Sequence, residues 1–367
     1  VAIGSHCLDH NIDGGGNVGV GTHVLSANTS GTSNTAIGQQ PMLYNTTGSY
    51  NVASGWTALQ DNTTGSYNAA IGGGALANNT TASGNIAIGH STLGTNTVGA
   101  QNTAIGHQAL TSNTEAYNNT AVGYQALTTN TTGAANVAVG AYALDANTTA
   151  SNNTGVGYQA LTTNTTGTRN VALGYNSLKV NSTANDNTAV GYLALWANTT
   201  GVQNVALGSY ALDANITGVN NIAIGYRALS TTETGIDNVG IGNQALYDAT
   251  SANYNTAVGG GALANNTTAD NNTAIGYVAM SANETGNQNV AVGAYALDAS
   301  FNSWDNTAIG YQALSATITN DSTAVGKAAL KANYNGANNV AVGKGALESN
   351  TSGNSNTGLG RSALYSN

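Results

Sequence analysis

Charged residues are scarce in this sequence of 367 residues. It contains 7 Lys and Arg against 16 Asp and Glu, a net charge of −9 with His taken as neutral. Nucleic-acid binding needs a dense basic surface, which this composition cannot supply. The Asn- and Thr-rich surface that remains would be a poor colloid unless something else solvates it. The composition therefore excludes a nucleic-acid partner.

Cysteine is nearly absent as well, and no long apolar run occurs. The single Cys7 excludes a disulfide framework but leaves the compartment undecided. We expect no membrane insertion, and the chain shows no signal peptide, initiator Met or unusual end copies. The repeat described below predicts a solenoid, and solenoids normally have polar caps at their ends. Since the end copies here are ordinary, we expect a segment of a longer fibre, or a subunit whose ends are covered by neighbouring copies.

The sequence contains no recognisable catalytic, metal-binding or phosphate-binding motif. The segment 6–10 holds two His and a Cys, but no fourth ligand follows at zinc spacing. Asp145, Asp213 and Asp298 share one position of the repeat described below, whereas calcium-binding β-rolls need an acidic residue in essentially every turn. The glycine string 72–74 precedes no helix that would present N–H groups to a phosphate. We predict no enzyme, no cofactor and no metal.

What the sequence has in abundance is a repeat. A glycine, here called the repeat glycine, recurs every 17 residues from Gly4 to Gly310 and, after one deleted residue, from Gly326 to Gly360. Self-similarity at a fixed period marks a repeat architecture. The register covers 22 copies without a break, so we predict a single array over residues 1–367.

Two apolar columns run through the copies. The residue before the repeat glycine is Ile, Val or Leu except at Ser54, and the residue four after it is Leu or Met. We predict that these two columns form the core. Ala or Gly stands two before the glycine, which indicates a position too tight for a larger side chain. The β-branched run before the glycine is typical of a short strand, and we expect a second short strand to end at the Leu.

Helix is the competing interpretation, because two copies make 34 residues, the length of a familiar helical repeat. The chain has 48 glycines, which destabilise helices, and its apolar residues do not recur every 3.6 residues, so a helical repeat is disfavoured. We therefore predict an all-β protein, a parallel β-solenoid (β-roll) of 22 tandem 17-residue coils forming an elongated rod. Each coil offers a thin core, so we expect lateral association, most simply a homotrimer with its alanine face inward; a monomeric rod is the alternative.

Asparagine forms two further columns. It stands four before the repeat glycine in 20 of the 21 copies that include that position, and seven after it in 18 of 22. In stacked coils each column would become a ladder of amides bonding coil to coil. Asn also tolerates the left-handed backbone conformations of tight turns, so it can serve simply as a turn residue in each coil. The ladder and the turn interpretation can hold together.

The loop asparagines also create N-glycosylation sequons. We predict regularly spaced, exposed acceptors, with sugar as a hypothesis and plain turn chemistry of Asn-Thr-Thr-Gly as its alternative. The acceptors are Asn45, Asn62, Asn79, Asn130, Asn147, Asn164, Asn198 and Asn266.

The column directly after the repeat glycine is predicted to be exposed. His90 and His107 are expected to stack there, and tyrosines in the same column either pack or stack on sugars. Lys327, Lys344 and Arg361 end the column, and because like charges one coil apart repel, we predict an acidic partner, sugar acid or neighbouring chain beside them. The tyrosines are Tyr124, Tyr158, Tyr175, Tyr192, Tyr226, Tyr277 and Tyr311.

The strings Asn-Thr-Ala-Ile-Gly-Tyr-Gln-Ala-Leu at 306–314, its near copy at 119–127, and the Thr-Thr-Gly-Ser-Tyr-Asn loops at 46–51 and 63–68 resemble repeats of phage tail-fibre-like and bacterial surface proteins. The Ala-Ile-Gly strand is similar to the head repeat of trimeric autotransporter adhesins. The resemblance implies a left-handed parallel β-roll, often trimeric, displayed outside a cell or on a virion. The period here is longer by the Asn-Thr-Thr-Gly loop, and the resemblance implies no catalytic residue.

Three functions follow as hypotheses. The first is a non-enzymatic structural segment of an extracellular fibre, self-associating end to end or as a trimer and decorated with glycans. The second is the rod of a surface adhesin or phage tail fibre. The third is ice binding through Thr ladders, which is disfavoured because adjacent threonines do not project from one face of a strand.

Overall fold

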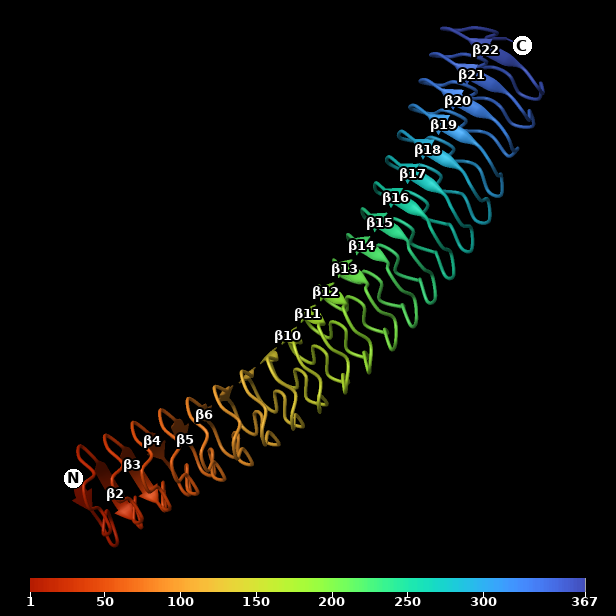
Figure 1. The fold of residues 1–367 in the computed structure, drawn as a ribbon. Coiled ribbons are helices and arrows are strands. Elements are labelled where there is room, and N and C mark those ends of the chain that lie inside the picture. The colour runs from red at the N-terminus through yellow and green to blue at the C-terminus, as the bar shows by residue number, and fades with distance from the viewer. Residues whose placement is uncertain (367) are drawn as a thin grey trace. The chain divides into compact units, whose positions relative to one another are not determined.

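The computed structural model describes residues 1–366, which fall into two compact units, one up to Asn185 (unit 1) and one from Asp186 onward (unit 2). Within each unit, short strands lie side by side in chain order (Figure 1). Residues 1–366 contain no helix. The predicted all-β parallel solenoid is therefore confirmed.

Each coil contributes one strand. The strands of unit 1 are β1 (Ala2–Ile3), β2 (Val18–Thr22), β3 (Thr35–Gln39), β4 (Val52–Ser54), β5 (Ala69–Ile71), β6 (Ile86–Ile88), β7 (Thr103–Ile105), β8 (Thr120–Val122), β9 (Val137–Val139), β10 (Thr154–Val156) and β11 (Val171–Leu173). Those of unit 2 are β12 (Thr188–Val190), β13 (Val205–Leu207), β14 (Ile222–Ile224), β15 (Val239–Ile241), β16 (Thr256–Val258), β17 (Thr273–Ile275), β18 (Val290–Val292), β19 (Thr307–Ile309), β20 (Thr323–Val325), β21 (Val340–Val342) and β22 (Thr357–Leu359).

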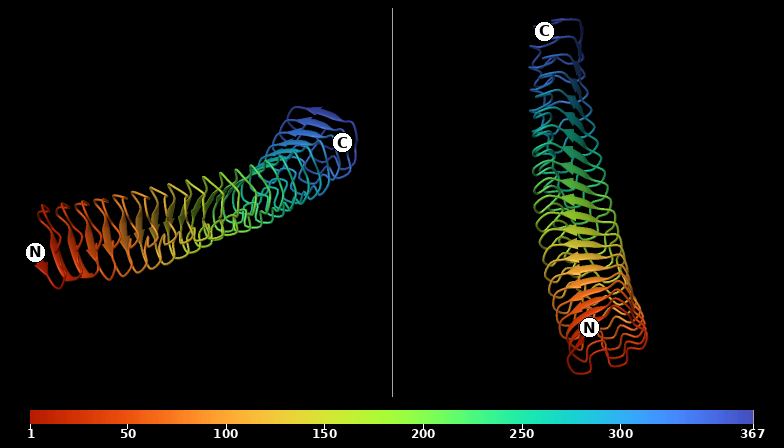
Figure 2. Two further views of the ribbon diagram at one scale, coloured as in Figure 1. Left: turned by 60° about the horizontal axis from the view of Figure 1, so that its bottom comes forward. Right: turned by 90° about the vertical axis from the view of Figure 1, so that its left-hand side faces the viewer.

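Strand register follows the sequence repeat. Thr103 of β7 pairs in parallel with Thr120 of β8, one period later. At the deletion, Thr307 of β19 pairs with Thr323 of β20, so the loop absorbs the missing residue and the strands stay aligned. Within each unit, the strands form one row and the loops lie beside it (Figure 2).

The core differs from the prediction in one of its two columns. The Leu column is fully buried between the first and last coils, as Leu110 illustrates, whereas Leu8 and Leu364 in the end coils are partly exposed. Ile105, directly before the repeat glycine, is 37% exposed. Ala104 between the outward residues of β7 is fully buried instead. Successive strand residues point to opposite faces, so when Ala points inward its neighbours must point out. The predicted core position of the Ile, Val and Leu column is therefore wrong.

The coil cross-section explains why the inward strand residue is small. At Gly155 a Cβ would lie only 3.2 Å from the Ala160 carbonyl oxygen and 3.3 Å from Leu144 Cγ. An alanine fits by small adjustments, whereas a larger side chain would force the coil apart. The tight-packing prediction for this column agrees with that geometry.

The predicted second strand is also wrong, because the chain turns after the repeat glycine. Gly106 has φ +134°, and a Cβ there would collide with the Gly123 carbonyl of the next coil. Gln108 and Leu110 then adopt φ of +56° and +53°. Left-handed conformations cost non-glycine residues about 1–2 kcal/mol each. Hydrogen bonds to the next coil, such as that from Leu110 N to Ala126 O at 3.0 Å, help to offset this cost.

Both asparagine columns are ladders. The Asn62 side-chain amide donates to Asn45 Oδ1 in the preceding coil at 2.7 Å and to Gly65 O in its own loop at 2.9 Å. In the other column, Asn51 N donates to Asn34 Oδ1 at 2.9 Å. One side chain thus closes a turn and joins two coils, so the ladder and turn interpretations hold together.

Candidate functional site

The sequon asparagines lie inside the molecule. All eight predicted acceptors are fully buried, and Asn62, for example, already uses its amide nitrogen in two hydrogen bonds. The prediction that these acceptors are exposed is wrong, because the turn position that creates the sequon also points the amide at the neighbouring coil. The buried acceptors are Asn45, Asn62, Asn79, Asn130, Asn147, Asn164, Asn198 and Asn266.

The alanine face is inside as well. Beyond β1, the central strand alanines, such as Ala104 and Ala274, are buried in a single chain. They cannot form the inward face of a trimer, so that part of the association prediction is wrong. The face left outside, here called the outer strand face, carries the residues three and one before the repeat glycine, none of which is Asp, Glu, Lys or Arg.

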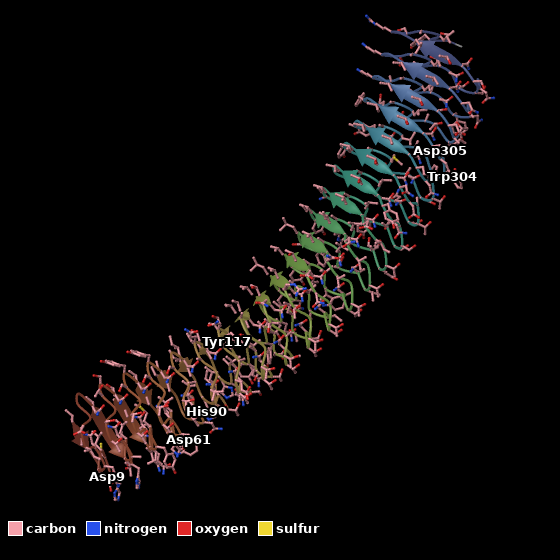
Figure 3. All side chains as sticks on the ribbon, viewed as in Figure 1. Asp9, Asp61, His90, Tyr117, Trp304 and Asp305 are labelled. Atoms are coloured by element: carbon pink, nitrogen blue, oxygen red, sulfur yellow. The ribbon has the colours of Figure 1, made fainter. Side chains whose placement is uncertain are left out.

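The tyrosine column lies on the outside, where it forms part of an aromatic ladder. His90, marked in Figure 3, stacks on His107 with ring centroids 5.5 Å apart, which confirms the predicted pair. His107 stacks on Tyr124 at 5.4 Å. In unit 1 the ladder continues through Tyr142, Tyr158 and Tyr175 at 5.3 to 6.2 Å. Rings inside the ladder have aromatic neighbours on both sides.

A second aromatic position was missed from the sequence. Tyr142, Tyr210 and Tyr295 stand two after the repeat glycine and meet the neighbouring tyrosines edge to face. The signal was present, because Ala or Ser follows the glycine in these three coils and the ring moves one residue along. In unit 2 they complete two ladders, Tyr192–Tyr210–Tyr226 and Tyr277–Tyr295–Tyr311.

The same three coils carry the half-buried aspartates. Burial raises the pKa of the Asp145, Asp213 and Asp298 carboxyl groups above the ordinary value. Ser230 Oγ donates to Asp213 Oδ1 at 2.6 Å. The corresponding Oδ1 atoms of Asp145 and Asp298 are buried and accept no hydrogen bond. The three sites differ, so a common ligand-binding role for this column is not supported.

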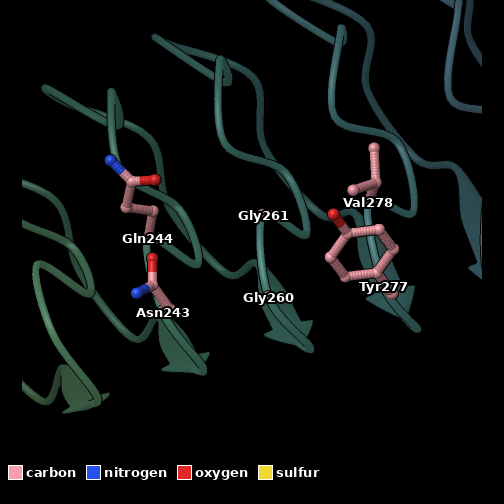
Figure 4. Close-up of a pocket in the computed structure, with 6 residues that line it drawn as sticks. All are labelled: Asn243, Gln244, Gly260, Gly261, Tyr277 and Val278. Carbon is pink, nitrogen blue, oxygen red and sulfur yellow. The ribbon is translucent and has the colours of Figure 1, made fainter.

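The ladder of unit 2 has a gap where two glycines replace the column side chains. Gly260 and Gly261 lie between Asn243 and Gln244 of the preceding coil and Tyr277 and Val278 of the next (Figure 4). These six residues line a hollow of about 280 Å³. Tyr277 is 58% exposed, against 43–46% for the other six predicted tyrosines. The glycines therefore uncover one ring of the column.

The basic end of the column is exposed. Lys327 Nζ lies 5.6 Å from the centre of the Tyr311 ring, a cation–π contact. No ion pair joins Lys327, Lys344 or Arg361 to an acidic residue anywhere in 1–366. The predicted acidic partner does not come from the described part of this chain, and an external one stays a prediction.

Within residues 1–366, His, Cys, Asp and Glu form no cluster of three or more that would bind a metal ion. Helical segments able to cross a membrane are likewise lacking from this range. Tyr117 and Trp304, both marked in Figure 3, are exposed on the loops. No family model and no curated protein matches the chain.

Proposed function

We propose that this chain is a non-enzymatic structural protein, a solenoid segment of an extracellular fibre. The observation that supports the proposal is how the buried polar side chains are used. In unit 1 every loop asparagine from Asn28 to Asn181 donates its amide to the asparagine one coil earlier. These buried amides therefore hold coil on coil, which is the use expected in a structural protein.

The outer strand face supports self-association. Its two rows, mostly Thr or Val and mostly Ile, Val or Leu, carry no charge in any coil, and Ile71, Ile88 and Ile105 are 37–43% exposed. Uncharged apolar rows are the kind of surface that copies of a fibre protein bury against each other. Assembly through this face replaces the trimer through the alanine face. The proposal includes no N-linked sugar on the buried sequons.

Three measurements test the proposal. Antibody against the purified chain is expected to label intact cells or particles of the source, and labelling only after permeabilisation would overturn an extracellular location. The denatured mass is expected at 36.5 kDa, without whole hexose units added. The native mass is expected at a multiple of that value. A native mass equal to one chain at micromolar concentration would contradict self-association.

The adhesin or tail-fibre rod is the alternative within the same class. It would place the same solenoid beneath a receptor-binding tip. The full gene decides between them, because a non-repetitive domain following the array would favour the rod of an attachment fibre. Repeats that continue on both sides would favour the fibre segment.

Ice binding is a second candidate, and one observation favours it. The outer strand face is regular and uncharged, and its threonines, such as Thr103 and Thr120, are half-exposed in consecutive coils. The loop threonines fit less well, because Thr63 Oγ1 is committed to Thr80 O at 3.0 Å. Freezing hysteresis that disappears when Thr120 is changed to Lys would support this candidate. Its absence in the unmodified protein would exclude it.

A further inference from the structure

We propose that the gap over Gly260 and Gly261 binds a single neutral pyranose ring. The site goes beyond the structural function, because its walls belong to three consecutive coils of unit 2 and need no assembled fibre. It differs from the aromatic ladders, where each ring inside the ladder is covered by its neighbours.

The gap has a simple origin in the sequence. Every other described coil in the range 192–327 has a side chain one or two residues after its repeat glycine, whereas the coil at Gly259 has none at either place. Gly260 lies outside the left-handed region, so glycine is not needed there for the backbone. Its Cβ would meet Tyr277 Cδ2 at 3.6 Å, an ordinary contact. Gly261 has φ +66°, but Gln244 and Val278 adopt φ of +54° and +57° at the same repeat position. The absence of both side chains is therefore a property of the surface and not of the fold.

The two walls are chemically different. On one side lies the ring of Tyr277, whose Cδ2 and Cε2 atoms are the nearest to a Cβ built at Gly260, at 3.6 and 3.8 Å. This ring meets the Tyr295 ring at 5.6 Å between centroids, with the two planes 82° apart. On the opposite side lie the exposed amides of Asn243 and Gln244 (Figure 4). Where two glutamines follow each other in adjacent coils, Gln125 Nε2 donates to Gln108 Oε1 at 2.8 Å. Gly261 offers Gln244 no such neighbouring side chain, and Gln244 lines the gap.

These walls select a sugar ring. An exposed aromatic ring packs against the apolar C–H groups of a pyranose, and amides donate to and accept from its hydroxyl groups. None of the six lining residues is charged, which favours a neutral ligand over a sugar acid. The hollow of about 280 Å³ is just below the roughly 300–1,000 Å³ of common small-molecule sites, so it suits one ring.

The thickness of the gap also favours a puckered ring over a flat one. The walls are two coils apart, about 9.6 Å, so a ligand at mid-gap lies roughly 4.8 Å from each. A flat aromatic ring in van der Waals contact with Tyr277, at about 3.5 Å, would leave the amide wall too far for hydrogen bonds. A saturated ring with equatorial hydroxyl groups fills the space between the ring and the amides.

The gap occurs twice in the sequence. The eleven residues 259–269 are identical to 72–82 in unit 1, where Gly73 and Gly74 again remove both column side chains. Trp56, 59% exposed, precedes that second gap, and His90 follows it. An aromatic ring thus borders the gap in both units.

Titration of the full chain with methyl β-D-glucopyranoside, methyl β-D-galactopyranoside and N-acetylglucosamine tests the site. The readout is the NMR shift of the Tyr277 ring, assigned by comparison with Tyr277→Phe. We expect at least one pyranoside to shift this ring with a Kd on the order of 1 mM, as few contacts to a small ligand allow. The absence of any shift at 50-fold higher concentration overturns the proposal.

Matched variants separate the gap from the rest of the surface. Gly260→Tyr recreates the Gly-Tyr pair of the other coils and is expected to weaken binding at least tenfold with an unchanged circular dichroism spectrum. Gly260→Ala, which adds one methyl group, checks the same point with less disturbance and is expected to weaken binding less. Tyr311→Ala, in the ladder but outside the gap, is expected to leave binding unchanged. Equal binding by Gly260→Tyr and the unmodified chain overturns the site.

A separate titration tests whether the ligand is a sugar. Phenol serves as a flat aromatic probe in the same titration, and we expect it to shift Tyr277 more weakly than the best pyranoside. Tighter binding of phenol would overturn the assignment to a sugar. Localisation and native mass do not enter these readouts, so failure here and failure of the proposed fibre function are distinguishable.

Discussion

The loop asparagine ladder is complete in unit 1 and interrupted in unit 2. In unit 1 the position seven after the repeat glycine is Asn in all eleven coils, from Asn11 to Asn181. In the described part of unit 2, Thr232, Ala249, Ser300 and Thr317 replace it. The interruption leaves Asn215 Oδ1, Thr232 Oγ1 and Asn283 Oδ1 buried without a hydrogen bond, whereas no atom of this column is left so in unit 1.

The difference shows that a ladder asparagine depends on the residue one coil later. Asn198 and Asn215 stand at the same repeat position as the ladder asparagines of unit 1, yet Asn215 Oδ1 has no donor because Thr232 has no amide nitrogen. Buried polar groups without partners cost about 1–3 kcal/mol each. We therefore expect unit 2 to be locally less stable around residues 215–249 than unit 1 is at any equivalent coil.

Breaking the intact ladder is expected to have the largest effect. Asn62→Ala removes the donor to Asn45 Oδ1 and to Gly65 O, and the acceptor that Asn79 uses at 2.9 Å. We expect a loss of roughly 2–4 kcal/mol in the local free energy of opening, because several buried groups lose partners together. Native-state hydrogen exchange of the flanking coils measures it.

Thr64→Ala is the control for that experiment. Thr64 is exposed, and its replacement destroys the sequon of Asn62 without touching the ladder. We expect a change within about 0.5 kcal/mol. If Thr64→Ala destabilised the coil as much as Asn62→Ala, the ladder would not be the source of the stability.

Repairing the ladder of unit 2 is the converse. Thr232→Asn with Ala249→Asn would restore amides from Asn198 to Asn283 and give Asn215 Oδ1 its missing donor. We expect roughly 1–3 kcal/mol of stabilisation, seen as slower hydrogen exchange around residues 215–266. Thr232→Asn alone is expected to give less than half, since its own oxygen would face Ala249. Equal gains from the single and double variants would contradict the dependence on the next coil.

A smaller repair is available at Ser300. Ser300→Asn would provide a donor for Asn283 Oδ1 but would remove the contact between the Ser300 and Ser303 hydroxyl groups. The two changes partly cancel, so we expect about 1 kcal/mol of net stabilisation at most. Hydrogen exchange in the coils of β17 and β18 reports it, and destabilisation would show that the serine pair outweighs the ladder.

The aspartates extend the comparison to pH and should give the smallest effect. Burial raises the pKa of Asp145 in the folded state, so the native chain holds its proton more tightly than the unfolded chain does. This contribution to stability therefore falls as pH rises through and above 3.8, the ordinary value. Asp145→Asn is expected to stabilise unit 1 at pH 7, with the gain disappearing below about pH 3.8.

Asp213 sharpens that prediction. Its pKa is also raised by burial, but Ser230 donates to its carboxylate at 2.6 Å, a bond that opposes the rise. Asp213→Asn should therefore gain less at pH 7 than Asp145→Asn. Thermal unfolding monitored by circular dichroism from pH 3 to pH 7 compares them, and a larger gain at Asp213 would contradict the role of the serine.

Sequence reasoning was strongest wherever one residue type repeats at one position. The short strand, the parallel register with its one-residue deletion, the stacked His90–His107 pair and the asparagine ladders were all predicted from the 17-residue period. The period works because stacking identical coils places identical side chains one strand spacing apart. It says nothing about which way those side chains point.

The tertiary structure therefore determines which side chains point into the coil and which point out. A three-residue strand such as Thr103–Ile105 has too few residues to show which face is inward, and hydrophobicity alone selected Ile105 over Ala104. Only the narrow interior of the coil, where Leu110 already fills the space, decides for alanine. The sequon asparagines, which we predicted to be exposed, are buried for a related reason. They occupy a turn of the loop at which the side chain points into the coil.

The amino-acid sequence by itself determined the period, the strand position, the register and the identity of each stacked pair, because these depend only on residues 17 apart. The tertiary structure decided what is inside and what is outside: the buried alanines and asparagines, the outer strand face, the breaks in the ladder of unit 2 and the gap over Gly260. Those properties depend on the cross-section of the coil and on the side chain one coil away, and both exist only once the coils are stacked.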